Sequence, residues 1–218
     1  MDFKKFITIE GVSAVEFRKD KVGMLDHTAV IFTSRNAIDH YFRMAKDMRL
    51  EIPDSMKYFC ASEAIAYYLQ KYVTYRKRKI FYGRGNMAGL MEIIIKQKSE
   101  SYLLPCSNIY KQDLPNLLEE NNIKHSKAVI YQTLPSDLSD LDIYNYDMLV
   151  FFSPTGVESL FTNFPDYKQG DTVIACFGPT TAQAIEDAGL RLDIKAPTKT
   201  SPSMTMAIEE FIEQNSKK

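Results

Sequence analysis

Short apolar runs alternate with amphipathic segments along the whole chain. The runs are rich in β-branched and aromatic residues, which favours buried strands. They are Thr28–Ser34, Lys57–Cys60, Lys79–Tyr82, Tyr102–Pro105, Lys127–Tyr131, Met148–Phe152, Val173–Phe177 and Arg191–Lys195. The segments between them carry apolar residues at helical spacing, such as Ala37, Ile38, Tyr41, Phe42 and Ala45. This alternation predicts an α/β fold in which helices cover a parallel sheet.

Two strand–helix junctions recur at almost the same separation. Residues 31–38 (IFTSRNAI) match residues 150–157 (VFFSPTGV) in pattern, 119 positions later, because each strand ends in Ser and leads directly into a helix. Residues 59–64 (FCASEA) correspond to residues 177–182 (FGPTTA), 118 positions later. Two matched junctions in the same order indicate a duplicated α/β domain rather than one continuous sheet.

Ser or Thr stands at each junction: Ser34, Ser62, Ser153 and Thr180. One interpretation is that these side chains cap their helices, at about 1 kcal/mol each. The other is anion binding, because the first N–H groups of a helix are unpaired and its dipole is positive at this end. Open parallel sheets bind ligands beyond the carboxyl ends of their strands. Four such junctions in twin domains therefore favour a cleft lined with N–H donors.

Charge is distributed unevenly along the chain. The net charge of −1 argues against a general nucleic-acid-binding protein. Residues 1–131 carry 21 Lys and Arg against 15 Asp and Glu, whereas residues 132–218 carry 6 against 13. The first stretch therefore suits an anionic partner better. It contains the basic run Arg76-Lys77-Arg78-Lys79, which we interpret as a solvated loop before a strand.

Several kinds of protein are excluded by what the sequence lacks. No apolar run is long enough to span a membrane, and no secretory signal is visible, so we expect a cytoplasmic protein. The three cysteines are too scattered for a disulfide framework or a zinc site, and no histidine has a second ligand at metal-binding spacing. Gly83, Gly85 and Gly89 follow a predicted strand, but their G-x-G-x-x-x-G spacing departs from dinucleotide-binding loops. We therefore expect no metal and a chemistry based on positioning and dipoles.

Five blocks occur in an order that resembles the uroporphyrinogen-III synthase family: VIFTSRNAIDHYF, LLPCSN, VIYQT, FFSPTGVESL and CFGPTTAQAIEDAGL. The likeness covers nearly all of residues 1–218, and FFSPTG and FGPTTA are its most specific parts. It implies two flavodoxin-like domains, that is doubly wound with parallel sheets, joined by a two-stranded linker with the active cleft between them. Residues 8–131 would form an inserted domain, and residues 1–7 with 132–218 the other.

The resemblance also implies an activity. The family cyclises linear hydroxymethylbilane to uroporphyrinogen III in haem biosynthesis, with inversion of ring D and no cofactor. This small-molecule tetrapyrrole is the implied partner, with no nucleic acid and no membrane. Its eight carboxylates suit helix starts lined with N–H groups and the positive balance of residues 1–131. Hydroxide leaves ring A, and attack by ring D gives a spiro intermediate that fragments and recloses. The protein must therefore hold a flexible chain in one reactive geometry.

Individual residues acquire roles from the resemblance. Tyr131, in VIYQT, matches the family tyrosine proposed to assist hydroxyl departure as a general acid; the alternative is a strand aromatic packed beside the linker. The residues expected to hold substrate carboxylates are Thr33, Ser34, Arg35, Ser62, Ser153, Thr155, Gly156, Thr180 and Thr181. Glu63 stands where many members have Thr and would repel an anion, so we expect it to point away.

The start of the chain departs from the family. Members open with a strand, a Thr-Arg-Pro-like turn and a helix before the strand that resembles Asp2–Ile7, and this first βα unit is missing from the second domain here. We expect either a sequence start that is too late, or a sheet repaired by swapping or dimerisation; otherwise we expect a monomer. The edge at Met148–Phe152 would be open to a foreign strand. A genuinely truncated chain would have weak activity or none.

Two other classes of function remain open at this point. One is a two-domain protein that closes on a small anion without catalysis, against which the lack of an export signal argues. The other is a nucleotide-dependent transferase that uses Gly83–Gly89. Nucleotide titration followed by tyrosine fluorescence would separate the transferase from a synthase that needs no nucleotide.

Overall fold

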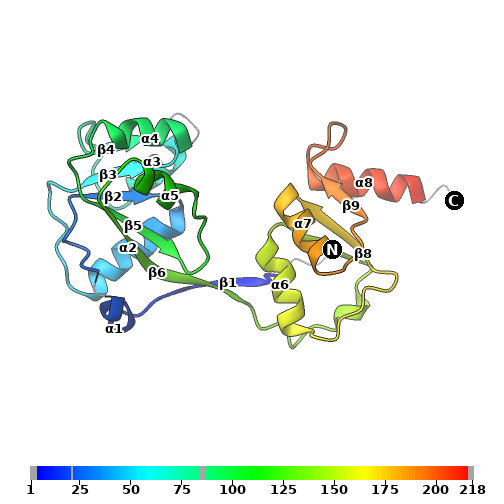
Figure 1. The fold of residues 1–218 in the computed structure, drawn as a ribbon. Helices are drawn as coiled ribbons and strands as arrows, with labels where there is room; N and C mark the ends of the chain where they lie inside the picture. Colours follow the sequence, from blue (N-terminus) through cyan, green and yellow to red (C-terminus); the bar gives the residue numbers. More distant parts are fainter. Residues whose placement is uncertain (1–3, 21, 84–86, 216–218) are drawn as a thin grey trace. The chain divides into compact units, whose positions relative to one another are not determined.

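The structure is a computed structural model that describes residues 4–20, 22–83 and 87–215. The chain forms two compact units: Met1–Thr8 with Leu134–Lys218, and Ile9–Thr133. No helix in the described ranges has the length and apolarity needed to cross a bilayer. Each unit has its own sheet (Figure 1), and its buried apolar residues form separate cores on the faces of that sheet.

Helices and strands alternate along the chain. The strands are β1 (Ile7–Gly11), β2 (Ala29–Phe32), β3 (Lys57–Cys60), β4 (Ile80–Tyr82), β5 (Tyr102–Ser107), β6 (His125–Pro135), β7 (Met148–Phe151), β8 (Val173–Phe177) and β9 (Ile194–Ala196). The helices are α1 (Ala14–Phe17), α2 (Arg35–Asp47), α3 (Glu63–Leu69), α4 (Met87–Ile95), α5 (Asp113–Glu120), α6 (Pro154–Asn163), α7 (Pro179–Asp187) and α8 (Met204–Asn215). Two 3₁₀ turns lie at Arg18–Asp20 and Ile143–Asn145. The predicted α/β fold with a mostly parallel sheet is confirmed.

Unit Ile9–Thr133 is built on a sheet in the order β1-β6-β5-β2-β3-β4. The strands from β2 to β6 pair in parallel. Numbered along the chain, these five strands have the order 3-2-1-4-5, which differs from the flavodoxin order 2-1-3-4-5. In both orders the first strand is interior, so the carboxyl ends of β2 and its neighbours form one edge at which ligands bind.

The central strand β2 is buried on both faces. Val30 and Phe32 pack into the core beneath α2 and α3, whereas Ala29 and Ile31 pack into the core beneath α4 and α5. The alternation follows from the two-residue period of a strand. All four residues are fully buried, as expected for a parallel strand covered on two sides.

Unit Met1–Thr8 with Leu134–Lys218 contains the parallel sheet β7-β8-β9. One core lies between this sheet and helices α6 and α7, and another lies beneath α8. In the described part of the chain β7 pairs with β8 alone, so β7 is an edge strand. Phe6 packs edge-on against Phe151, with ring centroids 5.7 Å apart.

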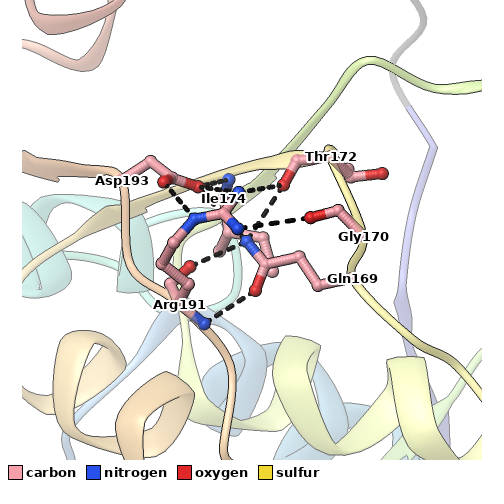
Figure 2. Close-up of polar contacts among 6 residues, drawn as sticks. All are labelled: Gln169, Gly170, Thr172, Ile174, Arg191 and Asp193. Carbon is pink, nitrogen blue, oxygen red and sulfur yellow. Dashed lines mark hydrogen bonds and ion pairs between the residues drawn. The ribbon is translucent and has the colours of Figure 1, made fainter.

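Residues 191–193, where the sequence predicts a strand, are held mainly by side-chain hydrogen bonds, beside one backbone bond from the Asp193 amide to the Ile174 carbonyl at 2.9 Å. The Arg191 Nε donates to Asp193 Oδ1 at 2.6 Å, and the Ile174 amide donates to Asp193 Oδ2 at 2.9 Å. Gln169 bonds both the carbonyl and the amide of Arg191, as Figure 2 shows. The strand prediction for Arg191–Lys195 is therefore wrong in its first half, and β9 begins at Ile194.

The predicted strand at Asp2–Ile7 is also displaced. Residues 1–3 lie outside the described residues, and β1 begins only at Ile7. The reason is that Phe6 is held by other groups: its carbonyl accepts from the Ser159 hydroxyl and from the Ser136 amide. The strand that follows pairs with β6.

Candidate functional site

Three of the four predicted junctions are capped helix starts. Ser34, Ser62 and Ser153 are the N-cap residues of α2, α3 and α6, and each Oγ accepts the amide three positions later, at 3.1, 3.4 and 3.3 Å respectively. The capping interpretation is thus confirmed for these residues. A cap satisfies one of the unpaired N–H groups at the start of a helix, so the first amides and the dipole remain available to an anion.

The start of α7 has a different arrangement. Gly178 is its N-cap, with a φ of 92°, and no side chain caps the helix. Pro179 occupies the first helical position, which its fixed φ and missing N–H favour, so Thr180 lies inside the helix rather than at the cap. The capping interpretation is wrong for Thr180. The amides of Thr180 and Thr181 face no side-chain cap, and only Thr180 exposes its side chain, since Thr181 is 1% exposed.

In unit Ile9–Thr133, two of the predicted residues meet. The Tyr131 hydroxyl lies 3.3 Å from the Ser34 Oγ. Tyr131 belongs to β6 and is 8% exposed. Burial raises its pKa and the Ser34 hydroxyl lowers it, with the net pKa above the usual value. Tyr131 is therefore a neutral phenol at pH 7 and can donate a proton.

His40, on α2, is a contact of Tyr131 that sequence reasoning missed. The two rings stack with centroids 5.1 Å apart and planes 15° from parallel. Burial and then the Arg43 charge lower the pKa of His40, so the ring is neutral at pH 7. Arg43 Nε donates to His40 Nδ1 at 3.2 Å, which places the ring proton on Nε2.

Arg43, on α2, holds the backbone around Val12 and Ile130 in place. One guanidinium nitrogen donates to the carbonyls of Val12, at 2.8 Å, and Ile130, at 3.2 Å. The other terminal nitrogen pairs with Asp47 at 2.8 Å. Because Ile130 directly precedes Tyr131, Arg43 ties α2 to the backbone that carries the tyrosine.

A polar cluster at the end of β5 was also missed. The Asn108 Oδ1 accepts from the Thr133 amide at 2.7 Å and from the Ser107 hydroxyl at 2.8 Å. The Asn108 amide donates to the Tyr131 carbonyl at 3.2 Å. The one signal in the sequence is Ser-Asn directly after an apolar strand, within the LLPCSN block.

The remaining predicted residues of this unit lie at the starts of α2 and α3. Thr33 and Arg35 are exposed on either side of Ser34, and the Arg35 guanidinium lies 5.3 Å from the Tyr68 ring centroid. Glu63 is exposed and accepts from the Tyr82 hydroxyl at 3.3 Å. That bond engages Glu63 with a neighbouring phenol.

In the other unit, the predicted residues gather at the ends of β7 and β8. Thr155 is half-buried, whereas Gly156 is buried so closely that an added Cβ would lie 3.4 Å from the Phe151 ring. An aromatic pair that no sequence motif indicates lies beside these helix starts: Phe152 is 66% exposed and stacks on Phe177, with ring centroids 6.3 Å apart. This edge combines unpaired amides with an exposed apolar surface.

Other chemistries find little support in the described ranges. They contain no group of three His, Cys, Asp or Glu side chains that could hold a metal ion. The cysteines are buried, and burial raises the pKa of Cys60 to about 12 and of Cys106 to about 11, so neither is a ready nucleophile. The glycine-rich loop proposed for a nucleotide includes Arg84–Asn86, which lie outside the described residues.

Comparison with known proteins gives a family match over residues 6–206, to the model described as uroporphyrinogen-III synthase HemD. The chain is 28% identical over 123 residues to a uroporphyrinogen-III synthase of Chlorobaculum parvum. This match spans 53% of the chain and about half, 50%, of the curated relative.

Solved structures agree on the fold. The uroporphyrinogen-III synthetase of Helicobacter pylori gives a TM-score of 0.62 at 18% identity, over 96% of this chain and 91% of that one. A mutant uroporphyrinogen III synthase of Thermus thermophilus gives 0.56 at 16% identity, over 98% and 88%. The family match covers most of the sequence, and the α/β architecture is shared. The chain belongs to the uroporphyrinogen-III synthase family.

Proposed function

We propose that this chain is a uroporphyrinogen-III synthase of the cytoplasm that cyclises hydroxymethylbilane, with inversion of ring D and without a cofactor. The observation that carries the proposal is the contact between Tyr131 and Ser34, at 3.3 Å, on the carboxyl edge of a parallel sheet. Tyr131 stands at the position that resembles the family tyrosine, and the family match covers residues 6–206. Ligands of such folds bind at this edge.

The proposed acid is the Tyr131 hydroxyl. Hydroxide is a poor leaving group, so a proton donated to the departing oxygen lowers the barrier. Tyr131 carries its proton at pH 7, as a phenol normally does, and burial raises its pKa further. Ser34, His40 and the Arg43 clamp hold the phenol in position. The tyrosine would re-acquire its proton from water after each turnover.

The proposed carboxylate contacts are the helix starts. Amides at the starts of α2, α3, α6 and α7 suit carboxylates through unpaired N–H groups and the helix dipole. The residues proposed for this surface are Thr33, Ser34, Arg35, Ser62, Ser153, Thr155, Gly156, Thr180 and Thr181. The Gly156 amide already donates to the Ser153 Oγ, so Gly156 would shape the surface rather than bind a carboxylate through its N–H. Thr181 would contribute its amide rather than its buried side chain. The exposed Phe152 beside Phe177 would pack against a pyrrole ring.

The proposed organisation is two doubly wound domains, flavodoxin-like in that broad sense. Residues 8–131 would form one, and residues 1–7 with 132–218 the other. The division into Ile9–Thr133 and the remaining residues supports these boundaries within two residues. The neighbouring strands β1 and β6 support a two-stranded linker. The separate parallel sheet of β7, β8 and β9 supports a second α/β domain.

The rate of substrate loss tests the proposal against a binding protein without catalysis. Freshly generated hydroxymethylbilane cyclises slowly by itself, so its disappearance is followed with and without the full chain. A synthase accelerates the loss at substoichiometric protein. A binding protein leaves the rate unchanged at that ratio and slows it at stoichiometric protein, and either result would overturn the proposal.

A further inference from the structure

A pocket lies at the amino-terminal edge of the sheet in unit Ile9–Thr133, opposite the carboxyl edge near Tyr131 and Ser34. Its volume is about 310 Å³, and Tyr58 and Ile80, near the starts of β3 and β4, line it. The loop before β3 contributes Met56, and α2 contributes Phe42. We call this cavity the amino-edge pocket. It is remote from Ser62, which follows the carboxyl end of β3.

Aromatic rings form much of the wall of the amino-edge pocket. The Phe42 and Tyr72 rings lie parallel, with centroids 4.6 Å apart and planes 3° from each other. The Tyr58 ring centroid is 6.4 Å from that of Phe42. The Tyr72 hydroxyl donates to Asp39 at 2.7 Å, which fixes the outer ring. A flat aromatic ligand can therefore pack against aromatic rings whose positions are fixed.

Tyr58 adds a polar group to the lining. The residue is 4% exposed, and its hydroxyl makes no hydrogen bond to another residue that the structure describes. Burial, and then the charge of Asp54, which also lines the cavity, raise the pKa of Tyr58 to about 12. The hydroxyl is thus protonated at pH 7. A ligand group that accepts this O–H would therefore gain a hydrogen bond.

The basic run noted in the sequence supplies the charge. Arg76 and Lys79 line the pocket, whereas Lys77 and Arg78 do not. Lys79 lies 3.7 Å from Asp54. The Arg76 guanidinium has no ion-pair or hydrogen-bond partner within the described ranges. The lining is therefore positive overall, and Arg presents a planar fork that fits carboxylate or phosphate oxygens.

We propose that the amino-edge pocket binds a small aromatic ring that carries a carboxylate or phosphate group. The ring packs against Phe42 and Tyr58, and the anionic group meets Arg76 and Lys79. The cavity is at the lower end of the range for ligand pockets, about 300–1,000 Å³, which suits one or two rings rather than a tetrapyrrole. The inference stands independently of the proposed synthase activity, because it uses the other edge of the sheet.

Calorimetry on the full chain with four probes tests whether binding needs both the aromatic ring and the anionic group. Indole-3-acetate and phenyl phosphate carry a ring and an anion, indole carries the ring alone, and acetate carries the anion alone. We expect the first two to bind at least about tenfold more tightly than the last two. Tighter binding of indole-3-acetate or of phenyl phosphate identifies the carboxylate or the phosphate as the preferred group, and either supports the proposal.

Variants locate the binding. Arg76→Ala and Lys79→Ala should each weaken the aromatic anion about fivefold or more, and Tyr58→Phe about threefold. Lys77→Ala is the matched control from the same basic run and should retain the wild-type affinity. Circular dichroism verifies the fold of each variant.

Three results overturn the inference. They are no measurable binding of either aromatic anion, equal binding of acetate, and an affinity in Arg76→Ala and Lys79→Ala that equals that of Lys77→Ala.

Discussion

The Tyr131 hydroxyl and the Ser34 hydroxyl lie 3.3 Å apart although 97 positions separate them in the sequence. Ser34 also caps α2 by accepting the Ala37 amide. The same serine therefore fixes the start of a helix and orients the phenol, which gives one side chain a structural and a positioning role.

Tyr131→Phe removes the proposed acid and keeps the ring. We expect kcat to fall by about tenfold to a hundredfold with KM nearly unchanged, because water can still assist the departing hydroxyl. Initial rates of uroporphyrinogen formation measure the effect. Tyr67→Phe, on the exposed face of α3, is the control and should behave as wild type. Complete loss with an intact fold would mean that catalysis depends on this side chain far more than on positioning.

Gly178→Ala tests the helix start of α7. The φ of 92° disfavours any side chain, so we expect a loss of about 1 kcal/mol in the free energy of unfolding and a higher KM, because the amides that follow would be reoriented. Gly189→Ala, at a φ of 72° in the same unit, is the control for backbone strain alone. Equal KM values in the two variants, measured beside urea unfolding, would remove α7 from the proposed binding surface.

Thr181→Ala separates the amide from the side chain. Thr181 is 1% exposed, so its hydroxyl is out of reach of a ligand in this structure, and we expect less than about a threefold change in KM. Steady-state kinetics provides the comparison, with Thr180→Ala as the exposed counterpart. A large increase in KM for Thr181→Ala alone would show that the hydroxyl contacts substrate.

Arg43→Ala breaks the tie between α2 and β6. Two backbone carbonyls lose a charged donor, so we expect the free energy of unfolding to fall by about 1–3 kcal/mol and kcat to fall through misplacement of Tyr131. Asp47→Ala removes only the exposed ion pair and should cost less than about 1 kcal/mol. Urea denaturation and initial rates measure both. If the two variants lose the same stability and rate, the carbonyl bonds contribute nothing.

Stability should depend on the pH through His40 and His27. Burial lowers the pKa of each histidine in the folded protein, so the unfolded chain takes up protons first as the pH falls. The free energy of unfolding then decreases below about pH 6.5 and is fully retained above it. Urea denaturation at pH 7.5 and 5.5 measures the difference. His40→Asn should reduce it; an unchanged pH dependence in His40→Asn would contradict the assignment.

Local sequence pattern located the strands well where a strand is buried on both faces. The predicted bounds of β3 and β8 coincide with the structure, since Lys57–Cys60 and Val173–Phe177 are short apolar runs between helices. The pattern failed to give the bounds of strands whose ends are set by contacts with residues far along the chain. β6 extends to Pro135, four residues beyond the prediction, and β9 begins three residues late because Asp193 bonds Arg191 and Ile174.

The candidate site was predictable only in part for the same reason. Ser34 and Ser62 directly follow apolar strands, and this position predicts that they cap the next helix. His40 and Asn108 reach Tyr131 because β5 and β6 are neighbours and α2 packs against them, and no local pattern contains that topology. Thr180 does not cap α7 because Pro179 already occupies the first helical position, which moves the cap back to Gly178.

The ratio of product isomers tests the central proposal most directly. The protein is incubated with freshly generated hydroxymethylbilane, the products are oxidised, and the type III and type I porphyrins are separated and quantified. Spontaneous closure leaves ring D uninverted and gives type I, so the proposed function predicts that type III dominates in the presence of the chain. A product mixture that stays type I, with the folded protein present, would contradict it.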